Sequence, residues 1–415
     1  MRSRKARGED SGRRVGAIPR SKGRLEIRPG RFSFRGFMKN LLACVFLASG
    51  SLLGAAEPPT ITISKSDKLS IGLGALPAEV ASVLQNDLLR SGYFKVVPAA
   101  SAGAGFVVSA TGGAGGLLGK VEDRGGKSVL SKTYTGNSRV QAHQFADEIV
   151  ETLTGNRGFA STKLAFVATR TGKKEIYTVD ADGSNLTQLT KDGSISVGPA
   201  LSPEGRMLTY TGYKSGYADI YQVVLGSGAR SRIIKFPGTN SGAAYSPEGN
   251  RLAVTLSKDG NPELYMTSAG GGSPRRLTRT PGVESSPTWS PDGDEIIYSY
   301  VDNGGPQLYR ISASGGSPRA LSTGHGYNTE PNWSPDGKKV AFNIREGGGF
   351  AVAILDLATS QTRTVGTGQD PVWGADSRHL VFATGGSLIL LDAQTGQRTT
   401  LVGGLGSISE PAWSR

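Results

Sequence analysis

Apolar residues followed by a short polar turn recur along the C-terminal part of this chain. The pattern is clearest at 287–293, Pro-Thr-Trp-Ser-Pro-Asp-Gly, and returns at 331–337 as Pro-Asn-Trp-Ser-Pro-Asp-Gly. Six copies place a large apolar residue at the same point, with steps of 44, 44, 44, 40 and 40: Leu201, Tyr245, Trp289, Trp333, Trp373 and Trp413. A period in the low forties with turn residues at fixed offsets is typical of an array of small β-sheets.

The polar half of each copy is expected to reverse the chain. Proline presets φ for the first corner, the acidic side chain bonds nearby backbone N–H groups, and glycine accepts positive φ. The acids could also be considered as metal ligands. Each stands alone with its proline and glycine, so we interpret them as turn residues.

Three further short strands are predicted between successive apolar anchors. In the first unit they are 163–168, 175–180 and 186–190, and four strands per repeat make one propeller blade. The six anchor strands and the six three-strand sets do not pair one to one along the chain. The first set has no anchor strand before it, and the last anchor strand, at 410–413, has no set after it. We therefore predict that 410–413 pairs beside 163–168, which closes a six-bladed ring and covers two sheet edges.

The region 69–157 has a different pattern and is predicted to be a small α/β domain. Helices are expected at 77–90 and 140–154, each with one apolar face, with Ser138 as an N-cap and Gly155 after the second helix. Strands are expected at 69–76, 94–97, 106–110, 117–121 and 128–134. The predicted fold class is mainly β, with a six-bladed β-propeller at 158–415 closed by the C-terminal strand.

The N-terminal 56 residues account for most of the positive charge. The chain carries +13, but residues 1–40 alone contribute +10, and the next sixteen residues are uncharged. Residues 38–56 have the basic start, apolar middle and small-residue end of a cleaved secretory signal, with the cut after Ala56, and translation is expected to begin at Met38. Removal of 1–56 would leave only +3, so the charge predicts no nucleic-acid partner.

The sequence shows no catalytic constellation. It has no nucleophile-elbow motif, its three histidines (His143, His325 and His379) lack metal-ligand spacing, and its Gly-rich run at 112–116 lacks the Lys-Ser/Thr of a P-loop. We therefore expect no enzyme activity, metal or cofactor. Two alternatives stay open, a propeller that gates a hydrolase domain and a propeller that binds a glycan or small ligand.

The loops that lead into the anchor strands gather on one face of a propeller, around its axis. Loops on a rigid scaffold often carry binding, although short loops are also polar by default. The polar residues there predict a docking face for a protein partner: Thr239, Asn240, Glu284, Ser285, Tyr327, Asn328, Thr329 and Glu330.

Several motifs together resemble the TolB family of periplasmic Tol–Pal envelope proteins. The most telling lies at the junction of the two predicted domains, in Ala146-Asp147-Glu148-Ile149, Leu153-Thr154-Gly155, Gly158-Phe159 and Thr162-Lys163-Leu164-Ala165-Phe166-Val167. The repeated Pro-x-Trp-Ser-Pro-Asp-Gly and the terminal Pro411-Ala412-Trp413-Ser414 also fit, and the resemblance spans nearly all of 57–415.

The resemblance implies a non-enzymatic, monomeric periplasmic scaffold with two protein partners. A Pal-like peptidoglycan-associated lipoprotein would bind the loop face of the propeller. A TolA-like inner-membrane protein would contact the lead-in segment 57–68 that follows signal cleavage, through Glu57, Ile61, Ile63 and Lys65. The implied role is support of outer-membrane integrity and of invagination at cell division.

Overall fold

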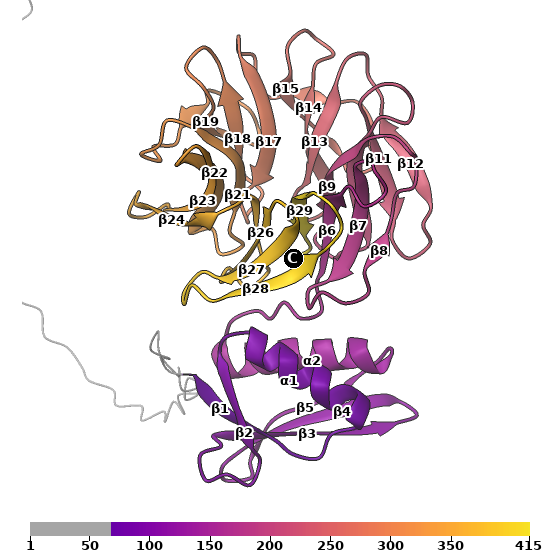
Figure 1. The fold of residues 1–415 in the computed structure, drawn as a ribbon, viewed down its shortest axis with the longest axis vertical. Coiled ribbons are helices and arrows are strands. Elements are labelled where there is room, and N and C mark those ends of the chain that lie inside the picture. Colours follow the sequence, from indigo (N-terminus) through magenta and orange to yellow (C-terminus); the bar gives the residue numbers. More distant parts are fainter. Residues whose placement is uncertain (1–67) are drawn as a thin grey trace, which may run out of the picture. The chain divides into compact units, whose positions relative to one another are not determined.

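The computed structural model describes residues 68–415 (Figure 1). The predicted signal, its cleavage at Ala56 and the lead-in residues Glu57, Ile61, Ile63 and Lys65 lie outside the described residues. Neither described helix is long and apolar enough to cross a membrane.

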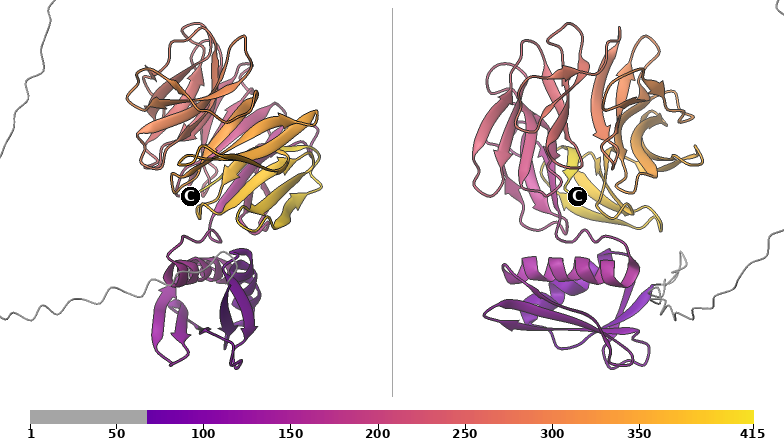
Figure 2. Two further views of the ribbon diagram at one scale, coloured as in Figure 1. Left: turned by 90° about the vertical axis from the view of Figure 1, so that its left-hand side faces the viewer. Right: turned by 180° about the vertical axis from the view of Figure 1, so that it is seen from behind.

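A five-stranded sheet and two helices form the small α/β domain. The sheet order is β2-β1-β3-β4-β5, and β1 runs parallel to both of its neighbours. Both helices cover the same face of the sheet (Figures 1 and 2). The elements are β1 (Leu69–Leu73), α1 (Ala78–Arg90), β2 (Phe94–Pro98), β3 (Phe106–Gly113), β4 (Gly116–Asp123), β5 (Ser128–Tyr134) and α2 (Ser138–Thr154).

The predicted apolar helix faces form the core of this domain. Val80, Leu84 and Leu88 of α1 are buried, as are Phe145 and Ile149 of α2, and all pack in one cluster. Gly155 caps α2 in the left-handed conformation, as predicted. The predicted N-cap was off by one residue, because Asn137 accepts the Val140 N–H at 3.0 Å while the Ser138 hydroxyl bonds Glu79.

Six four-stranded sheets arranged around a central axis confirm the predicted propeller (Figures 1 and 2). The first blade contains β29 (Ile408–Trp413), β6 (Lys163–Ala168), β7 (Glu175–Asp180) and β8 (Thr187–Gln188), and β8 is shorter than predicted. The other blades are, in order, β9 (Ser196–Leu201), β10 (Met207–Gly212), β11 (Asp219–Val224), β12 (Arg230–Ile234); β13 (Asn240–Tyr245), β14 (Arg251–Leu256), β15 (Glu263–Ser268), β16 (Arg275–Arg276); β17 (Val283–Trp289), β18 (Glu295–Val301), β19 (Gln307–Ser312), β20 (Arg319–Ala320); β21 (Asn328–Trp333), β22 (Lys339–Glu346), β23 (Gly349–Asp356), β24 (Thr362–Thr367); and β25 (Gln369–Trp373), β26 (His379–Thr384), β27 (Ser387–Asp392), β28 (Arg398–Gly403).

The C-terminal strand closes the ring as predicted. β29 pairs antiparallel with β6, with Ile408 opposite Ala168 and Trp413 opposite Leu164. The Trp413 indole N–H donates to Thr162 at 2.7 Å, and the Ser414 hydroxyl accepts the Lys163 N–H at 2.9 Å. The first blade therefore combines segments from opposite ends of the propeller sequence.

The Ser-Pro-Asp-Gly turns have the predicted chemistry. In the turn after Trp289, the Asp292 carboxylate accepts the Asp294 N–H at 3.0 Å, and Gly293 has a φ of 75°. The Ser290 hydroxyl accepts the Glu295 N–H at 2.9 Å. Trp289 itself is buried between blades, so the repeat unites a packing residue with a turn.

Candidate functional site: the axial cavity and its loop face

Six residues with a left-handed backbone conformation form a ring around the axis of the propeller. Each anchor strand has a β-bulge at the same level, and the bulge residue has a φ between 49° and 62°. Glycine occupies such bulges at little cost, but a non-glycine residue there costs roughly 1–2 kcal/mol. The ring consists of Gly198, Gly242, Ser286, Glu330, Asp370 and Glu410.

The acids of this ring are gathered on one half of it. Glu330, Asp370 and Glu410 come from the consecutive strands β21, β25 and β29, whereas the other three positions are small and neutral. The carboxylate of Glu410 accepts the Gly198 N–H at 2.6 Å, and that of Asp370 accepts the Glu410 N–H at 2.9 Å. Lys174 lies 3.7 Å from Glu410. The result is an acidic crescent, by which we mean Glu330, Asp370 and Glu410.

The crescent carboxylates hold their protons more tightly than ordinary carboxylates. The surrounding protein, and then the neighbouring Asp370 and Glu410, raise the pKa of Glu330 to about 7. Loss of hydration also raises the pKa of Asp370 and of Glu410. Glu330 is exposed, so screening by solvent offsets part of this effect.

The crescent borders a cavity of about 590 Å³ that is bounded by all six anchor strands. Arg415 lines the same cavity, follows the far end of β29, and donates to the Trp333 carbonyl at 3.1 Å. The cavity is therefore acidic at the level of the bulges and basic near Arg415. Such a concave, polar site on a rigid ring suits recognition of a charged group.

The predicted docking residues divide into accessible and buried sets. Thr239 and Glu330 are exposed, and Ser285, Tyr327 and Thr329 are half-buried. Tyr327 stacks under the Arg345 guanidinium, 4.8 Å from its ring centre, and packs on Phe350. These five residues could contact a partner.

The structure corrects the prediction for Asn240, Glu284 and Asn328, whose side chains are fully buried. Asn240 donates to the Ala218 and Phe236 carbonyls, and Asn328 donates to Gln307 and to the His325 carbonyl. Each therefore fastens the loop before its own anchor strand. Their positions repeat with the 44-residue step of the anchors, and that regularity could have identified them as structural.

Glu284 is buried beside a second carboxylate. Burial, together with Glu263, raises its pKa to about 7. Within residues 68–415, one oxygen of Glu263 and one of Glu284 have no hydrogen-bond partner. A shared proton would satisfy both, since two adjacent buried carboxylates cannot both ionise cheaply.

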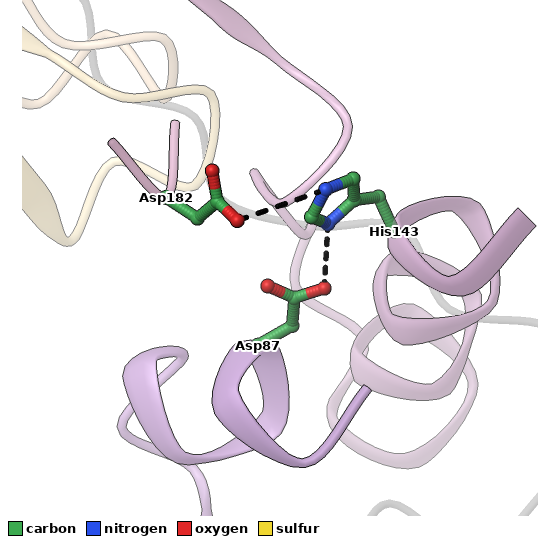
Figure 3. Close-up of side chains that lie close together, drawn as sticks. All are labelled: Asp87, His143 and Asp182. Carbon is green, nitrogen blue, oxygen red and sulfur yellow. Dashed lines mark hydrogen bonds and ion pairs between the residues drawn. The ribbon is translucent and has the colours of Figure 1, made fainter. Parts of the chain in front are cut away.

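A histidine cluster lies where the small domain contacts the propeller (Figure 3). His143 of α2 bonds Asp87 of α1 at 2.6 Å, and its other ring nitrogen lies 3.9 Å from Asp182 of the β7–β8 turn. The sequence predicts a histidine without metal-spaced neighbours, but the fold brings two carboxylates from distant segments close to it. These are suitable metal ligands by type.

The charges around this cluster argue against a metal. Asp182 already pairs with Arg139, and Arg90 donates to the Asp182 carbonyl at 2.7 Å. The two guanidinium groups balance the two carboxylates, so a divalent cation would add uncompensated charge. We interpret the cluster as a polar contact between the domains.

A second polar contact joins the same domains through Arg378 of the β25–β26 turn. Its guanidinium bonds Asp392 at 2.6 Å and the Gly92 carbonyl at 3.2 Å, and it lies 4.4 Å from the centre of the Tyr93 ring. Burial opposes ionisation of Asp392, but the bond and charge of Arg378 prevail and lower its pKa to about 2. The small domain thus attaches at the turn face of the propeller, opposite the loop face.

Comparisons with known proteins agree with this geometry. Residues 150–415 match the family model described as the TolB beta propeller domain. The TolB homolog of Chlorobaculum tepidum is 48% identical over 96 residues, 22% of each chain. The Tol-Pal system protein TolB of Anaeromyxobacter dehalogenans is 33% identical over 212 residues, 41% of this chain and 49% of the relative.

A solved structure extends the comparison to both domains. The crystal structure of TolB from Acinetobacter baumannii matches with a TM-score of 0.73 and 24% identity, over 84% of this chain and 97% of that one. This likeness shows the fold. The curated relatives above are matched over about a fifth to a half of their own length.

Proposed function

Because this chain belongs to the TolB β-propeller family, we propose that it is a non-catalytic component of a Tol–Pal system that docks protein partners. In this role it acts in the periplasm. A Pal-like lipoprotein binds the loop face, and a TolA-like protein contacts 57–68. The complex supports outer-membrane integrity and invagination at division.

The observation that carries the proposal is the ring of bulge residues. Four of its six members are non-glycine residues in the left-handed region, where strain persists when function or surrounding structure requires it. They place acidic side chains at an open cavity on a rigid scaffold. The pKa values of the ring's three carboxyl groups are all raised. Among the described residues, the cavity lining holds no histidine or cysteine to activate a nucleophile or act as one, which favours binding over chemistry.

A pull-down tests the docking role. The affinity tag should be inserted in the exposed 124–127 turn of the small domain, because a C-terminal tag would disturb the strand that closes the ring. The protein should capture the Pal-like lipoprotein from envelope extract. Deletion of 57–68 should leave the fold intact and change lipoprotein affinity or TolA contact.

Paired variants locate the docking face. Thr239→Glu with Thr329→Glu introduces two negative charges on the loop face and should weaken lipoprotein binding at least tenfold, measured by calorimetry. Gln361→Glu with Gln397→Glu makes the same charge change on the turn face and should bind normally. Equal affinities for the two double variants would contradict docking on the loop face.

A further inference from the structure

The loops of the loop face are divided sharply by charge. The loops of the first three blades, 169–174, 189–195, 213–218, 235–239, 257–262 and 277–282, carry eight cations and two anions. The loops of the last three blades, 302–306, 321–327, 347–348, 368, 385–386 and 404–407, carry one charged residue, Asp302. The cations are Arg170, Lys173, Lys174, Lys191, Lys214, Lys235, Lys258 and Arg279, and we call this set the basic half-rim.

Most of the half-rim charge is free to meet a partner. In the described part of the chain, Lys174, Lys214 and Lys258 pair with Glu410, Asp192 and Asp259. The other five are exposed and have no ion pair there. Asp192, one of the two anions, is further neutralised by Arg230 at 2.6 Å. Like charges within a Debye length of about 8 Å repel one another, so these unpaired cations do not stabilise the fold. Together they make the electrostatic potential at this surface positive.

Apolar side chains project from the same loops. Tyr217 is 73% exposed, Ile195 45% and Tyr213 40%. Ile195 and Tyr213 lie side by side, since the Tyr213 N–H donates to the Ile195 carbonyl at 2.9 Å. Tyrosine is one of the residues enriched among the anchors of protein interfaces. An anionic polymer would bind the cations, but these exposed apolar side chains would add little to its binding.

We propose that the basic half-rim, with Ile195, Tyr213 and Tyr217 at its centre, binds an acidic surface on the soluble domain of the lipoprotein partner. This rests on the proposed function and adds the chemistry of the contact. The acidic crescent on the other half of the face repels a uniformly acidic partner. The charge division therefore fixes the orientation of docking as well as the speed of association.

Surface plasmon resonance with the purified protein and the lipoprotein's soluble domain tests this inference at 50 and 300 mM salt. The variant Lys173→Glu/Lys191→Glu/Lys235→Glu should associate at least tenfold more slowly and lose most of the salt dependence. Tyr217→Ser should mainly speed dissociation. The control Lys120→Glu/Lys127→Glu/Lys338→Glu changes the net charge equally at exposed sites off the loop face and should bind like the wild type.

The outcomes separate this inference from the proposed function. If the wild type binds and both triple variants bind equally, the half-rim contact is overturned while the docking role stands. If the wild type does not bind the lipoprotein, both are overturned. If the half-rim variant keeps lipoprotein affinity but loses binding to phosphatidylglycerol vesicles or peptidoglycan fragments, the surface recognises an anionic lipid or glycan and the protein assignment is wrong.

Discussion

At the scale of the residue, repeat position decides what a polar side chain does. Asn240, Glu284 and Asn328 occupy equivalent positions in the first two residues of their anchor strands and are buried. Glu330, two residues after Asn328, lies in the cavity. Polarity alone could not separate them from the sequence. The difference arises from the β-bulge, which redirects side chains and depends on a partner strand.

Buried Glu284 makes stability depend on pH. Its pKa is about 7 in the fold and 4.5 as a free side chain, so the folded state binds more protons between these values. Wild-type stability therefore falls as pH rises through this window and stays low above it. Glu284→Gln gives Glu263 a permanent donor, and its gain in unfolding free energy over wild type should be about 2–3 kcal/mol larger at pH 8 than at pH 5.

Urea unfolding at both pH values measures this difference. Glu295→Gln, at a half-exposed ion pair with Arg310, is the control and should show little pH-dependent gain. A Glu284→Gln variant that tracks wild type across this range would mean that Glu284 is ionised in the fold.

At the scale of the element, the sequence determined the blades well because each repeats a packing residue and a turn. The closing strand was predictable from the number of strands. One three-strand set lacked an anchor strand and one anchor strand lacked a set, so the two were expected to pair in one blade. The outermost strand of the first blade was predicted at 186–190, but only Thr187–Gln188 forms a strand. Outer strands face solvent, so their alternation of apolar and polar residues is weak. The histidine cluster could not be predicted, because His143 and Asp87 meet only when the two helices pack, and Asp182 joins them only through contact between the domains.

The closing strand should be energetically important through Trp413. Its side chain is buried, packs edge-on against Phe159, and donates to Thr162. Trp413→Ala should lower the unfolding free energy by about 3–5 kcal/mol. Trp413→Phe keeps the apolar body and should cost less, about 1–2 kcal/mol from the hydrogen bond and lost volume.

Guanidinium unfolding with Val224→Ala as the control checks the closing strand. Val224 ends a strand and is 37% exposed, so its truncation should change stability by less than about 0.5 kcal/mol. Comparable small losses for Trp413→Ala would show that the first blade is stable without its last strand.

At the scale of the whole molecule, polar contacts hold the small domain against the propeller. Arg378 and Asp392 are 6% and 7% exposed, so removal of one partner leaves a buried charge. Arg378→Met should cost about 3–5 kcal/mol at pH 7. Because the pKa of Asp392 in the fold is about 2, the stabilisation by this pair is lost as pH falls from about 4 to 2, and the difference from wild type should shrink there.

Hydrogen exchange distinguishes loss at the junction from general unfolding. Protection should fall first around Gly92, whose carbonyl Arg378 bonds, and in the β25–β26 turn. Arg319→Met at an exposed position is the control and should leave exchange unchanged. Uniform deprotection of all six blades in the Arg378 variant would argue against a local contact between domains.

Because the final strand closes the ring, the first blade can be completed only after the whole propeller has been synthesised. The backbone of Lys163 bonds a residue 251 positions later in the chain. At about 5–20 residues per second, a ribosome needs roughly 13–50 s to make that stretch. Throughout this interval the first blade has an uncovered sheet edge, and such an edge can pair with another chain until the last residues emerge.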